Sequence, residues 1–254
     1  MHASGTSVAE KQNYENAIAS LNSLQSNFSV LQASVLRKHK DDCKHINDTI
    51  KYLDRVGISM KLLDTLPAIH VSGTKGKVGI GGRYDCTNVL RTTNTVGITS
   101  LGLEHTKLLG NTLEEIAWQK AGIVKPAADV FTVPQPSQCI EVIEQECQRS
   151  KANLHIVPAT LQEYSWASKS SLMEETSNIV GMNTSLAIQI ATNWMSKKHS
   201  EVTQNTVPLF VTEKTIHGID SCFWPGRLQQ ISYDSRKTLY LDAAHTVETN
   251  TNDC

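Results

Sequence analysis

The chain has 254 residues, of which 39% are hydrophobic, enough apolar material for one large or two small globular cores. Lysine and arginine number 24 against 25 acidic residues, and the formal net charge is -1. No long run of one sign accompanies this balance, which excludes an extended surface for nucleic acid or for an anionic membrane. We therefore expect small-molecule ligands and a monomer.

Cysteine spacing and apolar runs bear on the compartment. The six cysteines are scattered without a C-x-x-C pair, which disfavours a zinc ribbon or a disulfide framework and favours a reducing compartment. The first ten residues show neither an apolar signal core nor an Arg-rich transit pattern, and no apolar run approaches the ~18 residues of a membrane span. The expected location is the cytoplasm.

The first third of the chain predicts two helices and a strand. Apolar residues recur at steps of three and four over residues 14–37 and again over 46–56, which predicts two amphipathic helices. Gly57 is a suitable terminator of the second helix. A short apolar strand, residues 68–71, then runs into Ser72-Gly73.

From Thr95 onward, strand-like and helix-like runs alternate, which predicts βαβ units and a largely parallel sheet. These runs cover residues 96–103, 112–123, 129–133, 139–150 and 154–157. A polar loop is expected over residues 165–177, followed by a helix that carries Leu186, Ile190 and Trp194. Two further strands are expected at 228–233 and 238–242. The fold class is α/β.

The strand that ends at Val71 continues directly into SGTKGK. A glycine-rich turn after a buried strand can present successive backbone N–H groups and one lysine, here Lys77, to nucleotide phosphates. A solvent-exposed basic turn is the alternative. Val78 and Gly79 stand where a phosphate loop offers a Ser or Thr hydroxyl to Mg²⁺, and the next such hydroxyl is that of Thr87. The glycines that follow also form helices poorly.

Five ordered blocks resemble folylpolyglutamate synthases, relatives of the Mur ligases. The blocks are AIHVSGTKGK, VGIGGRYDCTN, LEHTKLLGNTLEEIAWQKAGI, WPGR and YLDAAHT. The resemblance extends from Tyr14 to His245. It implies a Mur-ligase-like P-loop ATPase domain over residues 1–222 and the start of a second α/β domain over residues 223–254.

The resemblance also implies an activity. Members of this family use ATP to phosphorylate the terminal carboxylate of a folate, and the amine of glutamate then displaces phosphate to form an amide. Tetrahydrofolate, glutamate and ATP are the implied substrates, with Mg²⁺ as cofactor and a monovalent cation as a further candidate. The family also makes a mitochondrial form conceivable beside the cytoplasmic one.

The same resemblance assigns site residues. The phosphate-binding residues would be Gly73, Thr74, Lys75, Gly76 and Lys77. His105 resembles a metal-binding histidine, with an ordinary helix-edge or loop histidine as the alternative. Lys120 resembles a lysine that is carbamylated near a second metal ion, with a helix-surface lysine as the alternative.

Four further residues are assigned by resemblance. Asn183 resembles an asparagine on the adenine side, or it is the N-terminal cap of a helix. Arg227 and Asp242 resemble a pair that contacts the nucleotide from the second domain, although WPGR alone is also typical of a turn. His245 resembles a residue near glutamate and the transferred phosphate. Lys77 and His245 are the expected catalytic residues.

The sequence departs from the family in two places. The phosphate turn is joined at Lys77 and Val78 to a block that family members carry much later, and Lys77 stands where they have a metal-binding glutamate. We therefore expect an internal deletion at 77/78 that removes several central elements, and a second domain truncated by the end of the chain at Cys254. Because such a deletion would remove neighbours from strands of a parallel sheet, we expect a marginally stable, aggregation-prone chain with impaired activity.

Three functional hypotheses remain from the sequence. The chain is an active ligase, or it is a non-catalytic isoform or gene-model fragment that binds a partner or is degraded. The third hypothesis is a sister ligase such as a dihydrofolate synthase or a peptidoglycan-precursor ligase. The opening YENAIASLNSLQSN and the block AWQKAGI favour the polyglutamate enzyme.

Overall fold

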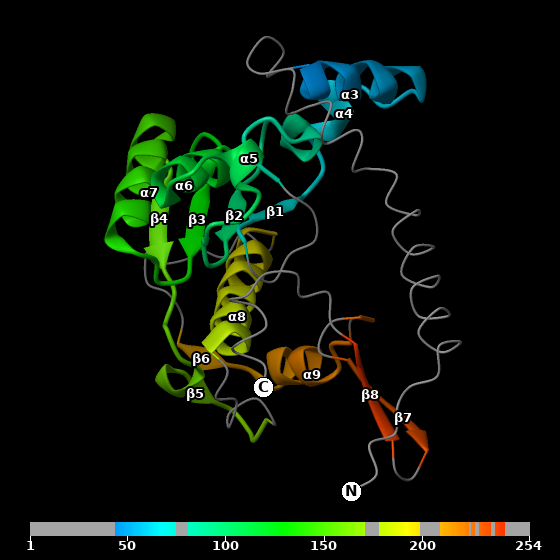
Figure 1. The fold of residues 1–254 in the computed structure, drawn as a ribbon, viewed down its shortest axis with the longest axis vertical. Coiled ribbons are helices and arrows are strands. Elements are labelled where there is room, and N and C mark those ends of the chain that lie inside the picture. Colours follow the sequence, from blue (N-terminus) through cyan, green and yellow to red (C-terminus); the bar gives the residue numbers. More distant parts are fainter. Residues whose placement is uncertain are drawn as a thin grey trace, which may run out of the picture. The chain divides into compact units, whose positions relative to one another are not determined.

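The computed structural model (Figure 1) describes residues 44–74, 81–170, 178–198, 209–223, 225–226, 229–234 and 237–241. Contacts divide the chain into two units, Met1–Asp42 and Cys43–Cys254, and every described residue lies in the second unit. The helix expected over residues 14–37 and the junction at 77/78 lie outside the described residues. The domain boundary expected after residue 222 stays a prediction.

Two helices precede the sheet. Helix α3, Lys44–Arg55, confirms the second predicted helix. Gly57 follows it with a φ of +79°, a left-handed conformation that glycine adopts at little cost and that ends the helix. The short helix α4, Met60–Leu63, begins after Ser59, whose hydroxyl accepts a hydrogen bond of 3.2 Å from the N–H of Leu62.

Four parallel strands form the central sheet in the order β1-β2-β3-β4, side by side in Figure 1. They are β1 Ile69–Ser72, β2 Thr95–Ile98, β3 Asp129–Thr132 and β4 Asn153–Ile156. The first residues of all four strands share one register, so the strands begin and end together. All four residues of β2 are buried, as expected for a parallel strand covered on both faces. The predicted α/β fold with a parallel sheet is confirmed.

Two helices cover one face of the sheet. Helix α6, Leu113–Ala121, and helix α7, Ser137–Ser150, pack with Val96, Ile98 and Val130 in the largest apolar cluster. Each aliphatic side chain buried in this way contributes about 1.5–3 kcal/mol to the free energy of unfolding. The strand-helix alternation read from the sequence therefore corresponds to real crossover connections.

Helix α8, Asn178–Lys198, covers the other face. Successive strand residues point to opposite faces, so Phe131 turns away from Val130 and packs against Leu186 of α8. Ile190 of α8 packs in the same cluster. None of the described helices combines the length and apolar content that crossing a membrane requires.

A half-buried carboxylate fastens the end of α8 to the amino edge of the sheet. Asp129 accepts hydrogen bonds from Asn153 at 2.9 Å and Asn193 at 2.8 Å, and it pairs with Lys197 at 2.8 Å. Burial alone would raise the pKa of Asp129, but hydrogen bonds from His155, Lys197 and the two asparagines hold it well below its usual value. The carboxylate therefore stays charged and fully paired.

A smaller cluster lies beyond the main sheet. Its elements are η2 Leu161–Glu163, β5 Ser165–Trp166, β6 Phe210–Val211 and α9 Glu213–Asp220. The loop expected over residues 165–177 is wrong at its first two residues, because β5 pairs in parallel with β6. The indole N–H of Trp166 donates to the carbonyl of Leu161 in η2 at 3.1 Å, which satisfies this donor within the cluster. Residues 171–177 lie outside the described part.

The two strands expected near the C-terminus are confirmed as an antiparallel hairpin. Strand β7, Gln229–Asp234, pairs with β8, Lys237–Leu241, and a bulge interrupts the ladder between Ser232 and Asp234. Every residue of β8 is exposed.

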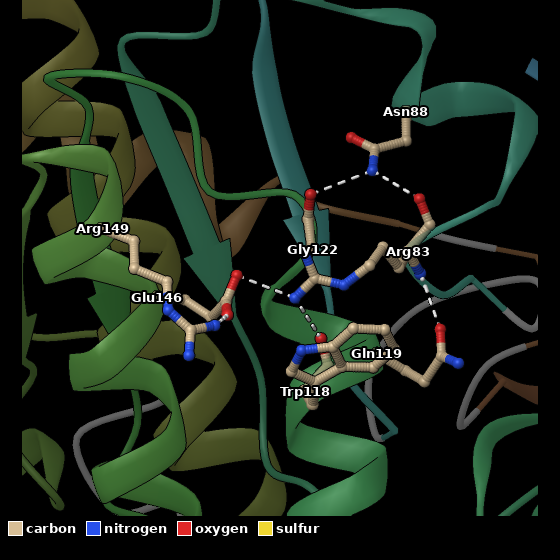
Figure 2. Close-up of polar contacts among 7 residues, drawn as sticks. All are labelled: Arg83, Asn88, Trp118, Gln119, Gly122, Glu146 and Arg149. Carbon is tan, nitrogen blue, oxygen red and sulfur yellow. Dashed lines mark hydrogen bonds and ion pairs between the residues drawn. The ribbon is translucent and has the colours of Figure 1, made fainter. Parts of the chain in front are cut away.

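Arg83 ties the segment after the glycine-rich stretch to helices α6 and α7 (Figure 2). Its guanidinium carbon lies 4.0 Å from the centre of the Trp118 ring. One guanidinium nitrogen donates to the Trp118 carbonyl at 2.9 Å and to Glu146 at 2.8 Å. The backbone N–H of Arg83 donates to Gln119 at 3.0 Å, so main chain and side chain are both anchored.

Asn88 completes this anchor from the short helix η1, Cys86–Val89. Its amide nitrogen donates to the carbonyls of Arg83 at 2.7 Å and Gly122 at 2.9 Å (Figure 2). A Cβ on Gly122 would lie 2.8 Å from the backbone and side chain of Arg83, so only glycine allows this approach.

We expect Arg83→Lys to lower the free energy of unfolding by about 1.5–3 kcal/mol, because lysine loses the forked hydrogen bonds and the stacking on Trp118. Arg149→Lys is the matched control. Arg149 also binds Glu146, at 2.6 Å, but its side chain is 66% exposed against 22% for Arg83, so its loss should cost under about 0.5 kcal/mol. Urea denaturation of both variants measures the difference, and equal losses would contradict the proposed anchor.

Candidate active site at the carboxyl edge of the sheet

The carboxyl ends of strands β1, β2 and β3 supply the candidate site. Ligands of open α/β sheets bind outside this edge, where the loops that follow the strands meet. Gly73 and Thr74 follow β1, the loop 99–105 follows β2, and Gln135 follows β3. Lys120 of helix α6 belongs to the same region, because its side chain contacts Glu104 of the loop 99–105.

Gly73 is the described start of the predicted phosphate turn. Its φ is +143°, and a Cβ at this position would lie 2.0 Å from the hydroxyl oxygen of Thr99 and 2.9 Å from the Thr99 backbone nitrogen. Only glycine therefore fits between the ends of β1 and β2. Lys75, Gly76 and Lys77 lie outside the described residues, so their phosphate-binding role stays a prediction.

Thr74 fastens the turn to the loop after β2. Its N–H donates to the Ser100 carbonyl at 3.0 Å. Its hydroxyl accepts from the N–H of Gly102 at 3.1 Å and lies 3.3 Å from the Gly102 carbonyl. The two loops are thereby joined through three contacts of one residue.

Lys120 is completely buried and paired with a carboxylate. Its side chain is 0% exposed, that of Glu104 is 5% exposed, and Nζ donates to Glu104 Oε1 at 3.1 Å. The alternative of a helix-surface lysine is therefore wrong. Removing one member of such a pair typically costs about 3–5 kcal/mol, because the other charge stays buried alone. Glu104 was not identified from the sequence, although it directly precedes His105.

His105 lies where the loop enters the short helix α5, Thr106–Leu109. Its φ of +47° is unusual for a residue with a side chain. Its carbonyl accepts from the N–H groups of Leu108 and Leu109 at 2.8 and 2.9 Å, and the residue is half-buried. The position matches a helix-edge histidine, and its role as a metal ligand stays a prediction.

Gln135 is a site residue that the sequence reasoning missed. Its side-chain amide donates to the Thr99 carbonyl at 2.9 Å and accepts from the N–H of Leu101 at 3.0 Å. A polar residue three positions after strand β3, in the sequence VPQP, was the available signal.

Asn183 lies inside helix α8, which begins at Asn178, so the alternative of an N-terminal cap is wrong. The neighbouring Met182 packs with Val133 and Val157, the residues directly after β3 and β4. This turn of α8 therefore lies at the carboxyl edge of the sheet. The adenine-side role of Asn183 stays a prediction.

Three predicted residues lie outside the described part of the chain: Arg227, Asp242 and His245. The described Pro225 and Gly226 form a turn before β7, with a φ of +74° at Gly226. The N–H of Gly226 donates to Gln229 at 2.8 Å. The WPGR block is thus consistent with a turn, whatever the role of Arg227.

Thr87, the first Ser or Thr after the phosphate turn, already uses its hydroxyl in hydrogen bonds. It donates to Asp85 at 2.6 Å and lies 3.4 Å from Nε2 of His70 on β1. Because Thr87 gives its single proton to Asp85, His70 must hold its own proton on Nε2 to donate to Thr87. Nδ1 of His70 is buried and has no hydrogen-bond partner among the described residues.

The described residues do not form a metal site in their present protonation states. No three His, Cys, Asp or Glu side chains converge within the described segments as a group that could hold a metal ion. An ammonium at Lys120 also neutralises Glu104, the buried carboxylate of the site. The pair in this form does not fit a divalent cation.

Acid should destabilise the fold through His70. Burial and the nearby charge of Lys125 outweigh Asp85 and lower the pKa of His70 to about 4 from the usual 6.5. The unfolded chain therefore binds this proton more readily than the folded chain. The stabilisation is complete above pH 6.5 and is lost as the pH falls toward 4, by about 3 kcal/mol in all.

His70→Gln should lower stability at pH 7 but remove this slope, because glutamine keeps a donor toward Thr87 and does not titrate. Urea denaturation at a series of pH values from 7 to 4 measures how the free energy of unfolding changes with pH. The control is His217→Gln, which replaces an exposed histidine on α9 and should keep the wild-type slope. An unchanged slope in the His70 variant would contradict the assignment.

No family model matches the chain. Curated proteins do match, and they are folylpolyglutamate synthases. The mitochondrial folylpolyglutamate synthase of Cricetulus griseus is 37% identical over 186 residues, which cover 67% of this chain and 31% of the relative. The mitochondrial enzyme of Bos taurus is 27% identical over 341 residues, covering 92% of this chain and 58% of the relative. A putative folylpolyglutamate synthase of Caenorhabditis elegans is 27% identical over 334 residues, which cover 92% of this chain and 64% of the relative.

The chain spans less than two thirds of each of these relatives. The 92% of this chain that aligns with the Bos taurus enzyme is about 234 residues, so about 107 of the 341 aligned positions have no counterpart here. An internal deletion was expected from the joined sequence blocks. Its position between Lys77 and Val78 stays a prediction.

Solved structures share the fold. The apo form of L. casei FPGS superposes with a TM-score of 0.51 at 22% identity, over 70% of this chain and 44% of that one. A structure described as an FPGS-AMPPCP-folate complex gives a TM-score of 0.51 at 24% identity, over the same shares. At these identities the similarity establishes the α/β fold.

Proposed function

The chain belongs to the folylpolyglutamate synthase family, and on this basis we propose that it binds MgATP at the carboxyl edge of its sheet. The observation that carries the proposal is the turn at Gly73, whose backbone lies against Thr99 with no room for a side chain. In the proposed site, the N–H groups that follow this turn and the ammonium of Lys77 would bind phosphate oxygens. One solved neighbour is a complex with AMPPCP, which supports a nucleotide as the ligand.

The full reaction proposed for the intact active site is the ATP-dependent addition of glutamate to tetrahydrofolate. The γ-phosphoryl group moves from ATP to an oxygen of the folate γ-carboxylate, giving an acyl phosphate and ADP. The amine of glutamate attacks the acyl carbon, phosphate leaves, and the amine loses a proton. Lys77 would neutralise charge on the transferred group, and His245 would lie near the glutamate.

Arg227 and Asp242 would contact the nucleotide from the second domain. Mg²⁺ would neutralise phosphate charge when bound, and a monovalent cation is a further candidate. The names of the curated relatives favour this reaction over that of a dihydrofolate synthase or a peptidoglycan-precursor ligase. The cytoplasm is the proposed location, with a mitochondrial form as the alternative suggested by the relatives' names.

A non-catalytic chain is the second candidate function. It is favoured by the roughly 107 aligned positions of the Bos taurus enzyme that have no counterpart here. We therefore propose that nucleotide binding is retained while glutamylation is strongly reduced. Incubation with MgATP, tetrahydrofolate and glutamate separates the two candidates, since glutamylated product at the rate of a full-length enzyme would exclude the second.

Titration calorimetry with MgATP should detect binding to the wild-type chain, and Lys77→Ala should weaken it by about tenfold or more, because a charge-assisted phosphate contact is lost. Lys61→Ala is the control, since Lys61 is an exposed lysine of α4 that does not belong to the phosphate turn. Absence of binding to a folded wild-type chain, or equal losses in both variants, would refute the proposed nucleotide site.

We further propose that Lys120 is carbamylated when a cation binds. A carbamate beside Glu104 would replace a neutral pair by two buried anions, which suit a divalent cation and are costly without one. NMR with ¹³C-labelled bicarbonate and Mg²⁺ should then show a carbamate carbon. Lys120→Arg keeps a cation beside Glu104 but should give no such signal. A wild-type spectrum without the signal would leave Lys120 as the ammonium partner of Glu104.

A further inference from the structure

We infer that Gln135 is a positioning residue: its amide holds the loop 99–102 and thereby sets the positions of Glu104, the partner of Lys120, and of His105. The relevance of this placement to MgATP rests on the proposed function. The effect of Gln135 on the loop itself does not.

The geometry uses both ends of one amide. Nε2 of Gln135 donates to the Thr99 carbonyl at 2.9 Å and to the Thr132 hydroxyl at 3.2 Å, while Oε1 accepts from the N–H of Leu101 at 3.0 Å. Among side chains of this length, only glutamine both donates and accepts through one planar group. The two loop peptide groups that it satisfies lie just beyond the sheet ladder, where strand neighbours no longer fix them.

The loop is held on its other sides as well. Thr74 binds Ser100 and Gly102 from the phosphate turn. Leu101 is 9% exposed and packs in the main apolar cluster with Ala117 of α6. The loop is therefore held between Thr74 of the phosphate turn and Gln135 beyond β3, with Gln135 supplying the polar contacts on the β3 side.

The clamp acts on the residues that follow it. Glu104 and His105 come two and three residues after Gly102, and the Glu104 carboxylate must reach Lys120 at 3.1 Å in a buried setting. His105 in addition holds a left-handed backbone conformation that its own side chain does not favour. A loop with free peptide groups at Thr99 and Leu101 would not keep both residues in place, and errors of about 1 Å at an active site can cost about a hundredfold in rate.

Two variants and a control test this role. Gln135→Met keeps the length of the side chain but neither donates nor accepts strongly, and Gln135→Glu keeps an acceptor for Leu101 while opposing the Thr99 carbonyl. Gln189→Met is the control. Gln189 is 1% exposed and donates to Tyr164 at 3.0 Å, so its loss removes a buried amide without touching the loop.

Hydrogen exchange followed by mass spectrometry is the first measurement. Both Gln135 variants should speed exchange of the amides from Leu101 to His105 by about tenfold or more, with β2 and β3 unchanged. The imidazole resonances of His105, assigned with His105→Gln, should shift in the same two variants. Gln189→Met should do neither, even if it lowers the unfolding temperature as much. Unchanged exchange and resonances in the Gln135 variants would overturn the inference.

Nucleotide affinity separates this inference from the proposed function. The Gln135 variants should weaken MgATP more than metal-free ATP by about tenfold, because they displace Glu104 and His105, the side chains that would face Mg²⁺ once Lys120 is carbamylated, and leave Lys77 alone. A wild-type chain that binds neither form would refute the proposed function, while the exchange and resonance data would still decide whether Gln135 positions the loop. Equal weakening of both forms would overturn the link to the metal side.

Discussion

Four parallel strands in one register bring their carboxyl ends to a single edge, and the rest of the structure depends on this alignment. Strand β2 is buried on both faces, so its polar loop contacts lie at its carboxyl end. There the loop that leads to Glu104 runs between Thr74 and Gln135. The helices on the two faces fix the strands laterally. Site geometry is therefore a consequence of sheet packing, and the loops contribute mainly hydrogen bonds.

Buried polar groups have a common character in this chain. The ammonium of Lys120 pairs with the Glu104 carboxylate, the half-buried Asp129 carboxylate accepts several hydrogen bonds, and His70 is neutral because burial penalises its charged form. Each group is stable in one protonation state and costly in the other. The site is thus rigid in the form described, and any chemistry that changes the charge of Lys120 has to bring a compensating ion with it.

Periodicity was sufficient for the sheet and its helices, because buried stripes and strand-helix alternation are local properties that the sequence states directly. It could not find the pairing of Lys120 with Glu104, since the depth at which α6 buries its lysine depends on how α6 packs against the loop. Gln135 was missed for the same reason: its partners are backbone groups of another loop. Asn183 shows the opposite error. It was a plausible N-terminal cap from the local sequence, but α8 begins five residues earlier, at Asn178.

Strand β1 is the least supported member of the sheet. Of the described strands only β2 pairs with it, and Ile69 and Val71 are 38% and 37% exposed on the face that α8 covers elsewhere. A strand that pairs with one neighbour and has partly exposed apolar side chains is the first to open in local fluctuations. Since β1 runs directly into Gly73, each such opening would also disturb the turn proposed to bind phosphates. Nucleotide binding at the proposed site would therefore be coupled to the fraying of a single strand.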